Sequence, residues 1–182
     1  MNITKSKLDG VVLISPIVFN DERGKFVKTY REDLFVSLGL SDEFKEEFFT
    51  ISKNRVLRGL HFQTPPFDHS KIVYCPKGEA MDVVVDLRKN SPTYGEFDVF
   101  HLNNMCNNIL YIPKGFAHGF YAISDEVIMM YKVSSVHSQE NDSGILWNSL
   151  PIPWPDDNPI ISQRDKNLLP FNLFLSPFSY KK

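Results

Sequence analysis

Arg58, His61 and Lys71 lie close together in the chain and carry side chains that suit acid–base chemistry. Apolar residues alternate imperfectly with them, as in a strand that has one polar face. Because Arg58 and His61 are three residues apart, a regular strand would point them to opposite faces. Gly59 between them is suited to a bulge that turns both side chains to the same face. A Pro-Pro pair at 65–66 ends this strand, and Lys71 begins the next one.

A histidine, a lysine, a tyrosine and a carboxylate together can abstract a proton next to a carbonyl group and return one elsewhere. Histidine is a suitable base because its pKa lies near neutral pH, and a carboxylate on its second nitrogen stabilises the imidazolium. Lysine supplies positive charge where an enolate oxygen develops, and tyrosine can act as the acid. The alternative is structural: His61 could be a core histidine and the two cations could lie on a solvated rim.

The rest of the chain predicts the scaffold that would position these residues. Short apolar runs recur between turns rich in glycine and proline, which is typical of a sandwich or closed barrel, most simply an all-β jelly roll. Segment 151–182 is interpreted as a tail over the barrel mouth, so residues 1–182 form one domain. The sequence predicts a short N-terminal helix at 31–38, while segment 44–51 could be a helix or a strand. The predicted strands are 11–14, 25–30, 72–75, 81–87, 97–102, 109–112, 116–121 and 127–133.

Composition and charge argue against several functional classes. Of the 182 residues, 42% are hydrophobic and 23% are charged, an ordinary balance for a globular protein with a sizeable core. A net charge of −2 without a basic run argues against nucleic acid as a partner. The two cysteines form no disulfide framework, and no apolar run is long enough to span a membrane. No signal-peptide pattern is present, so we expect a cytoplasmic protein.

A β-barrel with histidines also invites a metal-binding interpretation. Metal-binding jelly rolls commonly use two histidines one residue apart on the same strand face. This chain has no His-x-His pair, and His69 lies in a predicted turn. We therefore expect a site without a metal ion or cofactor. Elemental analysis of the purified protein would decide the alternative, a metal-dependent enzyme.

Short polar and aromatic motifs are spread over nearly the whole chain. They are Asp21–Phe26, Arg58–Gln63, Lys71, Gly78–Glu79, Asp82–Arg88, Ser91–Thr93, Ile112–Phe120, Tyr131–Lys132, Gly144–Asn148 and Ser162–Asp165. No single motif is specific, but together, with their spacings kept, they resemble the dTDP-4-dehydrorhamnose 3,5-epimerases.

The resemblance implies a metal-free cupin jelly roll that forms a homodimer, in which the N-terminal strand reaches the partner's site. His61 would be the base, held by Asp165, while Lys71 would stabilise the enolate and Tyr131 would be the acid. The implied substrate-binding set is Arg58 and His118 near the sugar and diphosphate, Gln63 and Arg164 from the shared motifs, and Arg23 and Phe26 reaching the nucleotide from the neighbouring subunit.

Three departures from the family pattern concern the substrate. Lys28 stands where the family has a glutamate, and we expect it to face the nucleotide. Segment 48–52 replaces a glutamine and an asparagine that help to recognise thymine, and Phe49 and Ile51 are expected to leave a wider, stacking-dominated pocket. His137 stands where a second tyrosine is expected, which puts inversion of both sugar carbons in question.

The predicted activity is inversion of C3 and C5 of a nucleotide-diphospho-4-keto sugar through an enolate, in cell-surface polysaccharide synthesis. Because the Lys28 ammonium only donates hydrogen bonds, it could reach a carbonyl oxygen of guanine. A GDP-linked sugar, such as a 4-keto heptose, is therefore favoured over dTDP-4-dehydro-6-deoxyglucose. The alternatives are a C3-only epimerase, a cupin 3,4-ketoisomerase that uses the same enolate, and a non-catalytic cupin that only binds nucleotide sugars.

Overall fold

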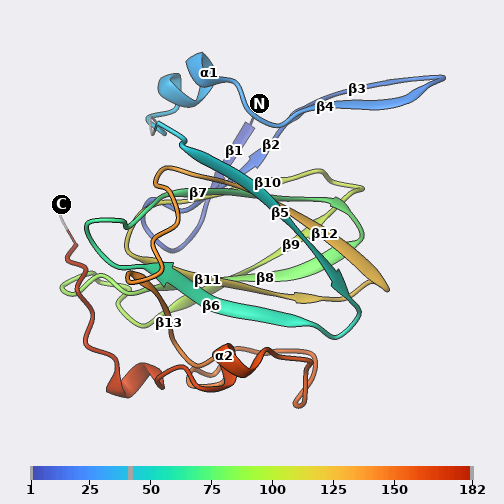
Figure 1. The fold of residues 1–182 in the computed structure, drawn as a ribbon. Coiled ribbons are helices and arrows are strands. Elements are labelled where there is room, and N and C mark those ends of the chain that lie inside the picture. Colours follow the sequence, from blue (N-terminus) through green and yellow to red (C-terminus); the bar gives the residue numbers. More distant parts are fainter. Residues whose placement is uncertain (1, 41–42, 181–182) are drawn as a thin grey trace.

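Two antiparallel sheets face each other in the computed structural model, which describes residues 2–40 and 43–180 (Figure 1). The first sheet has six strands, in the spatial order β1 (Asn2–Lys5), β2 (Val12–Ser15), β10 (Ile109–Ile112), β7 (Lys71–Lys77), β12 (Glu126–Val133) and β5 (Glu46–Lys53). The second has five, in the order β13 (Asp142–Gly144), β6 (Leu57–Gln63), β11 (Phe116–Ala122), β8 (Glu79–Asp86) and β9 (Phe97–Asn103).

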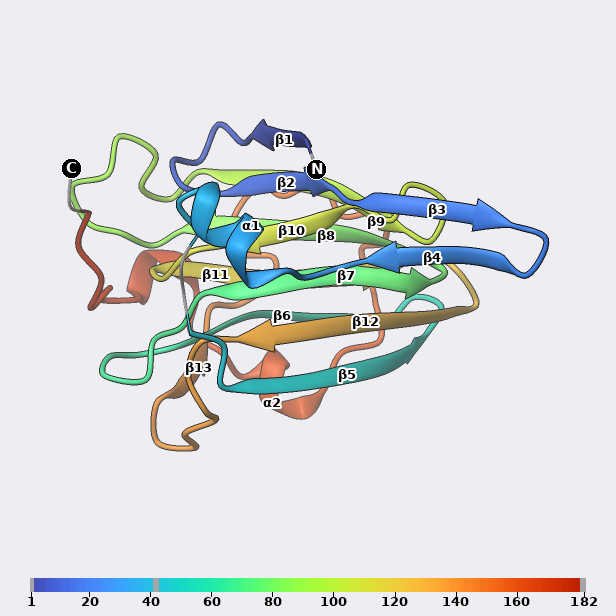
Figure 2. The ribbon, with the colours of Figure 1, turned by 90° about the horizontal axis from the view of Figure 1, so that it is seen from above.

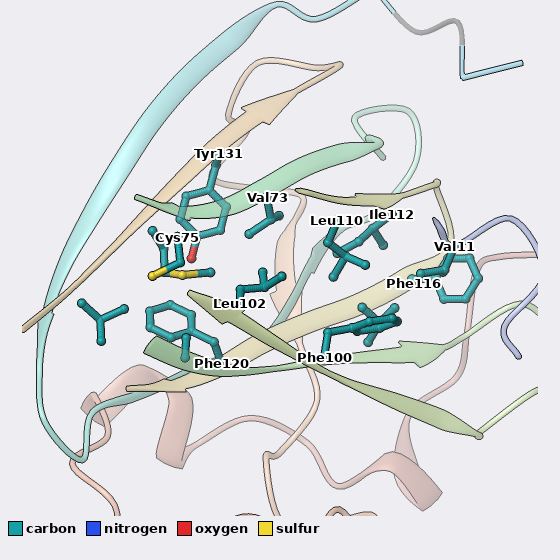
Figure 3. Close-up of a cluster of buried hydrophobic side chains, with 14 of the residues drawn as sticks. Val11, Val73, Cys75, Phe100, Leu102, Leu110, Ile112, Phe116, Phe120 and Tyr131 are labelled. Carbon is teal, nitrogen blue, oxygen red and sulfur yellow. The ribbon is translucent and has the colours of Figure 1, made fainter. Parts of the chain in front are cut away.

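The space between the sheets is filled by alternate residues of the facing strands, because successive side chains of a strand point to opposite faces. Figure 3 shows Tyr131 and Phe120 pointing towards each other from the two sheets, among buried aliphatic side chains. This arrangement is the jelly roll that the sequence predicted.

The outer face of each sheet is covered by a different part of the chain. Helix α1 (Glu32–Ser37) places Phe35 against the six-stranded sheet. The C-terminal segment, which includes helix α2 (Gln163–Lys166) and the 3-10 turn η1 (Phe171–Leu173), runs along the five-stranded sheet (Figure 1). Most of the tail therefore covers the face of that sheet and not the barrel mouth, because its aromatic residues pack on the apolar outer side of β6, β8 and β11. Within the described part of the tail, helix α2 alone reaches the rim of the space between the sheets, through Arg164.

A register shift in the pairing of β6 with β11 turns Arg58 and His61 to the same side of the sheet. His61 pairs with His118 and Arg58 pairs with Phe120, so three residue steps on β6 match two steps on β11. The extra residue beside Gly59 is a bulge. The predicted bulge is thus confirmed, and both side chains point into the space between the sheets.

Most predicted elements are found within one or two residues of their expected bounds. The ambiguous segment 44–51 is a strand, β5, because it pairs with β12 over its whole length. The sequence did not predict β1, β3, β13 or helix α2. Within the part of the chain that the structure describes, no helix is long and apolar enough to cross a membrane.

Strands β3 (Ile17–Asp21) and β4 (Gly24–Lys28) form a separate hairpin that projects beyond the two sheets (Figure 2). Its two phenylalanines, Phe19 and Phe26, are 61% and 59% exposed. Lys25 ties the hairpin to the turn after β9, where its Nζ donates to Asn104 O and to Asn107 Oδ1. Lys25 lies next to the hairpin turn, so the hairpin is tied to the body of the protein there while its aromatic side chains face solvent.

Candidate active site

A cavity of about 350 Å³ lies between the two sheets and opens to solvent. Its walls come from β5, β7 and β12 on one side and from β6 and β11 on the other, with β13 and α2 at the rim. The lining residues are Glu46, Phe48, Thr50, Arg58, His61, Phe62, Gln63, His69, Lys71, His118, Gly119, Phe120, Tyr131, Val133, Ser135, His137, Asp142 and Arg164.

His61 and Asp165 form a hydrogen-bonded pair at the five-stranded wall. His61 Nε2 lies 2.8 Å from Asp165 Oδ1, and the second carboxylate oxygen accepts a 3.2 Å hydrogen bond from Gly59 N. Burial alone would raise the pKa of Asp165, but the hydrogen bonds from His61, Gly59 and Ser162 outweigh burial and lower it. The carboxylate therefore stays ionised and fixes the proton on Nε2, which leaves Nδ1 as the basic nitrogen.

Helix α2 brings Asp165 to His61 from 104 positions away in the chain. Ser162 caps this single helical turn by accepting a 3.1 Å hydrogen bond from Asp165 N. The cap explains why a polar segment in the tail forms a helical turn directly beneath β6. Asp165 is buried there, so its position is determined by the fold instead of by a flexible loop.

Lys71 lies on the opposite wall, at the start of β7. Its Nζ donates a 3.1 Å hydrogen bond to His61 O, and the side chain is buried. Burial lowers the pKa of Lys71 to about 8, although the charges of Asp142 and Asp82 oppose this change. The amine is thus a cation at neutral pH that is poorly solvated and available to a developing negative charge.

Tyr131 on β12 points into the cavity from the six-stranded sheet (Figure 3). The ring of Phe48 on β5 stacks on it, with centroids 4.8 Å apart and an interplanar angle of 14°. Burial raises the pKa of the Tyr131 phenol, so this group holds its proton at neutral pH. A protonated phenol on one wall therefore faces a histidine base on the other.

His118 and Asp82 form a second buried pair next to this set. His118 Nε2 lies 2.8 Å from Asp82 Oδ2, and both side chains are almost completely enclosed. Burial raises the pKa of Asp82 and lowers that of His118, which disfavours the ionised form of each group. The carboxylate orients the imidazole, which lines the cavity beside Tyr131.

Four further predicted substrate-binding residues lie in the cavity wall. Arg58 donates to Ser52 Oγ and Ile51 O at 3.0 and 3.3 Å. His137 is exposed at the rim. Arg164 forms an ion pair with Asp142 at 2.7 Å. The Gln63 amide makes hydrogen bonds to backbone groups of the protein.

The other three, Arg23, Phe26 and Lys28, lie on the projecting hairpin and not in the cavity wall of this chain. Arg23 is paired with Asp21 in the hairpin turn. If these residues contact a nucleotide, as predicted, that nucleotide must be bound in the cavity of another subunit, as the resemblance implies.

The alternation of β5 corrects one sequence-based inference. Phe49 and Ile51 were expected to alter the pocket, but both point to the outer side of the six-stranded sheet and are more than half exposed. Phe48 and Thr50 line the cavity instead. The sequence could not settle this point because segment 44–51 had no certain secondary structure, and inward and outward faces depend on strand pairing.

Sequence reasoning gave no role to three polar residues that the structure places at the site: Asp82, His69 and Asp142. Asp82 had a signal in the sequence, because a carboxylate amid the valines of a buried strand needs a partner. His69 and Asp142 lie in a connection and an edge strand, where polar residues are common. Among the residues that the structure describes, no three histidine, cysteine or acidic side chains are grouped to hold a metal ion.

The jelly roll and the acid–base residues between its sheets are features that this chain shares with cupin-type isomerases. The chain belongs to the dTDP-4-dehydrorhamnose 3,5-epimerase family, whose model matches residues 5–172. It is accordingly an enzyme of the isomerase class. A 3,5-epimerase of this name from Methanothermobacter thermautotrophicus is 44% identical over 171 residues, which cover 91% of this chain and 92% of the relative.

Two other relatives bear on the reaction. The crystal structure of a dTDP-6-deoxy-D-glucose-3,5-epimerase from Legionella pneumophila, in complex with dTDP-4-keto-L-rhamnose, superposes with a TM-score of 0.95 at 33% identity. The match covers 100% of this chain and 99% of that one. A dTDP-4-dehydrorhamnose 3-epimerase from Streptomyces niveus is 35% identical over 172 residues, covering 93% of this chain and 83% of the relative.

Proposed function

We propose that this enzyme inverts C3 and C5 of dTDP-4-dehydro-6-deoxyglucose through enolate intermediates. The main observation in support of this proposal is that His61 and Tyr131 lie on opposite walls of one cavity, with Lys71 beside them. A base on one face of a sugar ring and an acid on the other are what an inversion requires. Membership of the family supports the same reaction.

In the proposed mechanism, His61 Nδ1 removes the proton next to the 4-keto group, and Asp165 stabilises the imidazolium that forms. The electron pair moves into the ring and the negative charge develops on the keto oxygen. Lys71 stabilises this oxyanion from the six-stranded wall, and His118 lines the cavity on the five-stranded wall. Tyr131 then delivers a proton to the carbon from the opposite face, which inverts the centre.

The nucleotide is proposed to be dTDP. The Legionella relative was solved with a dTDP-sugar, while the preference for GDP has no support among the relatives. The three residues expected to favour GDP do not line the cavity of this chain: Phe49 and Ile51 point away from it, and Lys28 lies on the hairpin outside it. A direct comparison of dTDP, GDP, CDP and UDP binding by calorimetry tests this choice. Tighter binding of GDP than of dTDP would reverse it.

A homodimer is proposed as the working form. The projecting hairpin carries two exposed phenylalanines, and Phe49 and Ile51 add exposed apolar surface on the six-stranded sheet. Exposed apolar patches of this kind are typical of interfaces. Light scattering should give a mass of about twice 21.0 kDa. A fully active monomer would exclude a contribution of Arg23 and Phe26 to a neighbouring site. The proposed setting is the cytoplasm, in the synthesis of cell-surface polysaccharide sugars.

Deuterium exchange tests the proposed chemistry and separates it from its alternatives. Incubation with dTDP-4-dehydro-6-deoxyglucose in heavy water should place deuterium at both C3 and C5, as read by NMR. Exchange at C3 alone would make the enzyme a 3-epimerase, the activity named for the Streptomyces relative. A product with the carbonyl at C3 would identify a 3,4-ketoisomerase. Tight binding without exchange would identify a non-catalytic binding protein, which would not need the His61–Asp165 pair.

A further inference from the structure

His69 lines the same cavity and has no part in the mechanism above. It lies in the connection between β6 and β7, two residues before Lys71, and is partly buried. Its Nδ1 is 3.1 Å from Nε2 of Gln63. The role of this histidine depends on which of its two ring nitrogens carries the proton.

The orientation of the Gln63 amide decides that question. Gln63 Oε1 accepts a 2.6 Å hydrogen bond from Ser138 N, so the oxygen end of the amide faces that backbone donor. The nitrogen end faces two carbonyl acceptors, Phe67 O at 2.8 Å and Val136 O at 3.2 Å. A reversed amide would set oxygen against both carbonyls, so the nitrogen end of the amide faces His69 Nδ1. An amide nitrogen cannot accept a hydrogen bond, so Nδ1 carries no proton and shares the two amide hydrogens with the two carbonyls.

An imidazole that accepts at Nδ1 and is neutral carries its proton on Nε2. Burial lowers the pKa of His69 to about 3, and the nearby positive charges of Lys71 and Lys114 act in the same direction, as do His137 and His118. His69 is therefore neutral at physiological pH. It is a fixed hydrogen-bond donor and not an acid or base. Among the described residues, none accepts a hydrogen bond from His69 Nε2.

The position of His69 in the cavity indicates which part of a substrate it would contact. Arg58 lies near the start of β6 and Gln63 lies at its end. The two residues are five positions apart on the strand, which corresponds to a backbone separation of about 15 Å. His61 lies between them, on the same side of the sheet. If Arg58 is at the diphosphate end, His69 is at the far end, beyond the reacting carbons. An oxygen on the side of the sugar remote from the diphosphate would lie there.

We propose that His69 Nε2–H is a specificity determinant that donates a hydrogen bond to a sugar oxygen remote from the diphosphate, with Gln63 holding the ring in the required tautomer. This inference rests on the proposed function and adds a residue to it. It also explains why the Gln63 amide makes its hydrogen bonds within the protein: Gln63 would orient the His69 ring, and His69 would contact the substrate.

Two substitutions at the same position test the contact. His69→Asn keeps a polar atom beside Gln63 but removes the N–H that reaches the cavity, whereas His69→Gln keeps an N–H at about the reach of Nε2. We expect H69N to lower kcat/KM for the sugar nucleotide about fivefold to a hundredfold, because a buried oxygen would lose its donor. H69Q should recover most of this loss. His101→Asn, an exposed histidine outside the cavity, should match the wild type.

Binding of dTDP without a sugar separates sugar recognition from nucleotide recognition. Its affinity should be the same for the wild type, H69N and H69Q. Equal kcat/KM for H69N and the wild type would overturn the proposal. Loss of dTDP affinity by the same factor as kcat/KM would also overturn it, because the contact would then be to the nucleotide.

NMR on the wild-type enzyme gives a readout that needs neither activity nor a folded variant. Long-range proton–nitrogen spectra should show His69 as the neutral Nε2–H tautomer from pH 5 to pH 8. An Nδ1–H tautomer, or titration within that range, would refute the assignment. Wild-type enzyme without any deuterium exchange would instead refute the proposed function, and the tautomer would still decide whether His69 is the donor described.

Discussion

Asp165→Asn tests the central pair of the site with a change that keeps the shape of the side chain. The carboxylate lies 2.8 Å from His61 Nε2 and is buried, so it stabilises the imidazolium without competition from water. A hydrogen bond to a charged partner contributes about 1.5–3 kcal/mol, which corresponds to about a 10- to 150-fold loss of kcat. The Gly59 N–H needs the amide oxygen as its acceptor, so the NH2 of asparagine would face His61 Nε2 and favour the wrong tautomer; the loss should therefore be near the upper end.

The assay is the rate of deuterium wash-in at C3, measured by NMR at substrate saturation. Asp156→Asn is the matched control, because Asp156 lies in the same tail and pairs with Arg55 outside the cavity. It should leave the exchange rate within about twofold of the wild type. Wild-type exchange by D165N would show that Asp165 does not assist the base, and the assignment of the pair would be wrong.

The same substitution should change how stability depends on pH. The pKa of Asp165 is lowered in the folded protein, so its carboxylate stabilises the fold above the unfolded pKa of about 3.9. This stabilisation is lost as pH falls through the folded pKa. The free energy of unfolding of D165N, measured with urea, should therefore depend less on pH in the acid range than that of the wild type.

Three further predictions concern charge, stacking and the scaffold. Because Lys71 must be a cation to stabilise an oxyanion and burial lowers its pKa to about 8, kcat should fall as pH rises through about 8, and a pH–rate profile that is flat there would contradict this role. Phe48→Leu removes the ring stacked on Tyr131 and should lower kcat/KM about two- to tenfold; an unchanged kcat/KM would mean that the stacked ring does not help to position the phenol. Arg88→Met removes two hydrogen bonds to the buried Asp86 carboxylate, which keeps those from Ser91 and Thr93, so urea unfolding should show a loss of about 1.5–3 kcal/mol; a loss below about 0.5 kcal/mol would mean that the pair adds little.

Much of the scaffold could be predicted from local patterns in the sequence. Short apolar runs between glycine and proline turns indicated the strands, and the helix at 31–38 followed from its spaced apolar residues and the glycine at its end. The bulge at Gly59 could also be predicted, because two polar residues with one function stood three apart on a strand. Local propensity and periodicity are properties of neighbouring residues, so they can be read without the tertiary fold.

The convergence of the catalytic set was predicted only through resemblance to a family. Nothing within the sequence of the tail indicated that Asp165 would reach His61 across 104 positions. Helix α2 brings it there because the tail packs its aromatic residues on the outer face of the five-stranded sheet, and that packing depends on the whole assembled sheet. Contacts between distant segments are decided by burial of surface that exists only after the sheets have formed.

The sequence by itself therefore determined the strands, the polar face that carries Arg58 and His61, and the family. The tertiary structure decided which side of β5 faces the cavity, where the tail lies, and that Gln63 contacts His69. These features depend on register, because a shift of one residue moves every side chain of a strand to the other face. Register is set by pairing with strands far away in the sequence, and for that reason no local pattern could specify it.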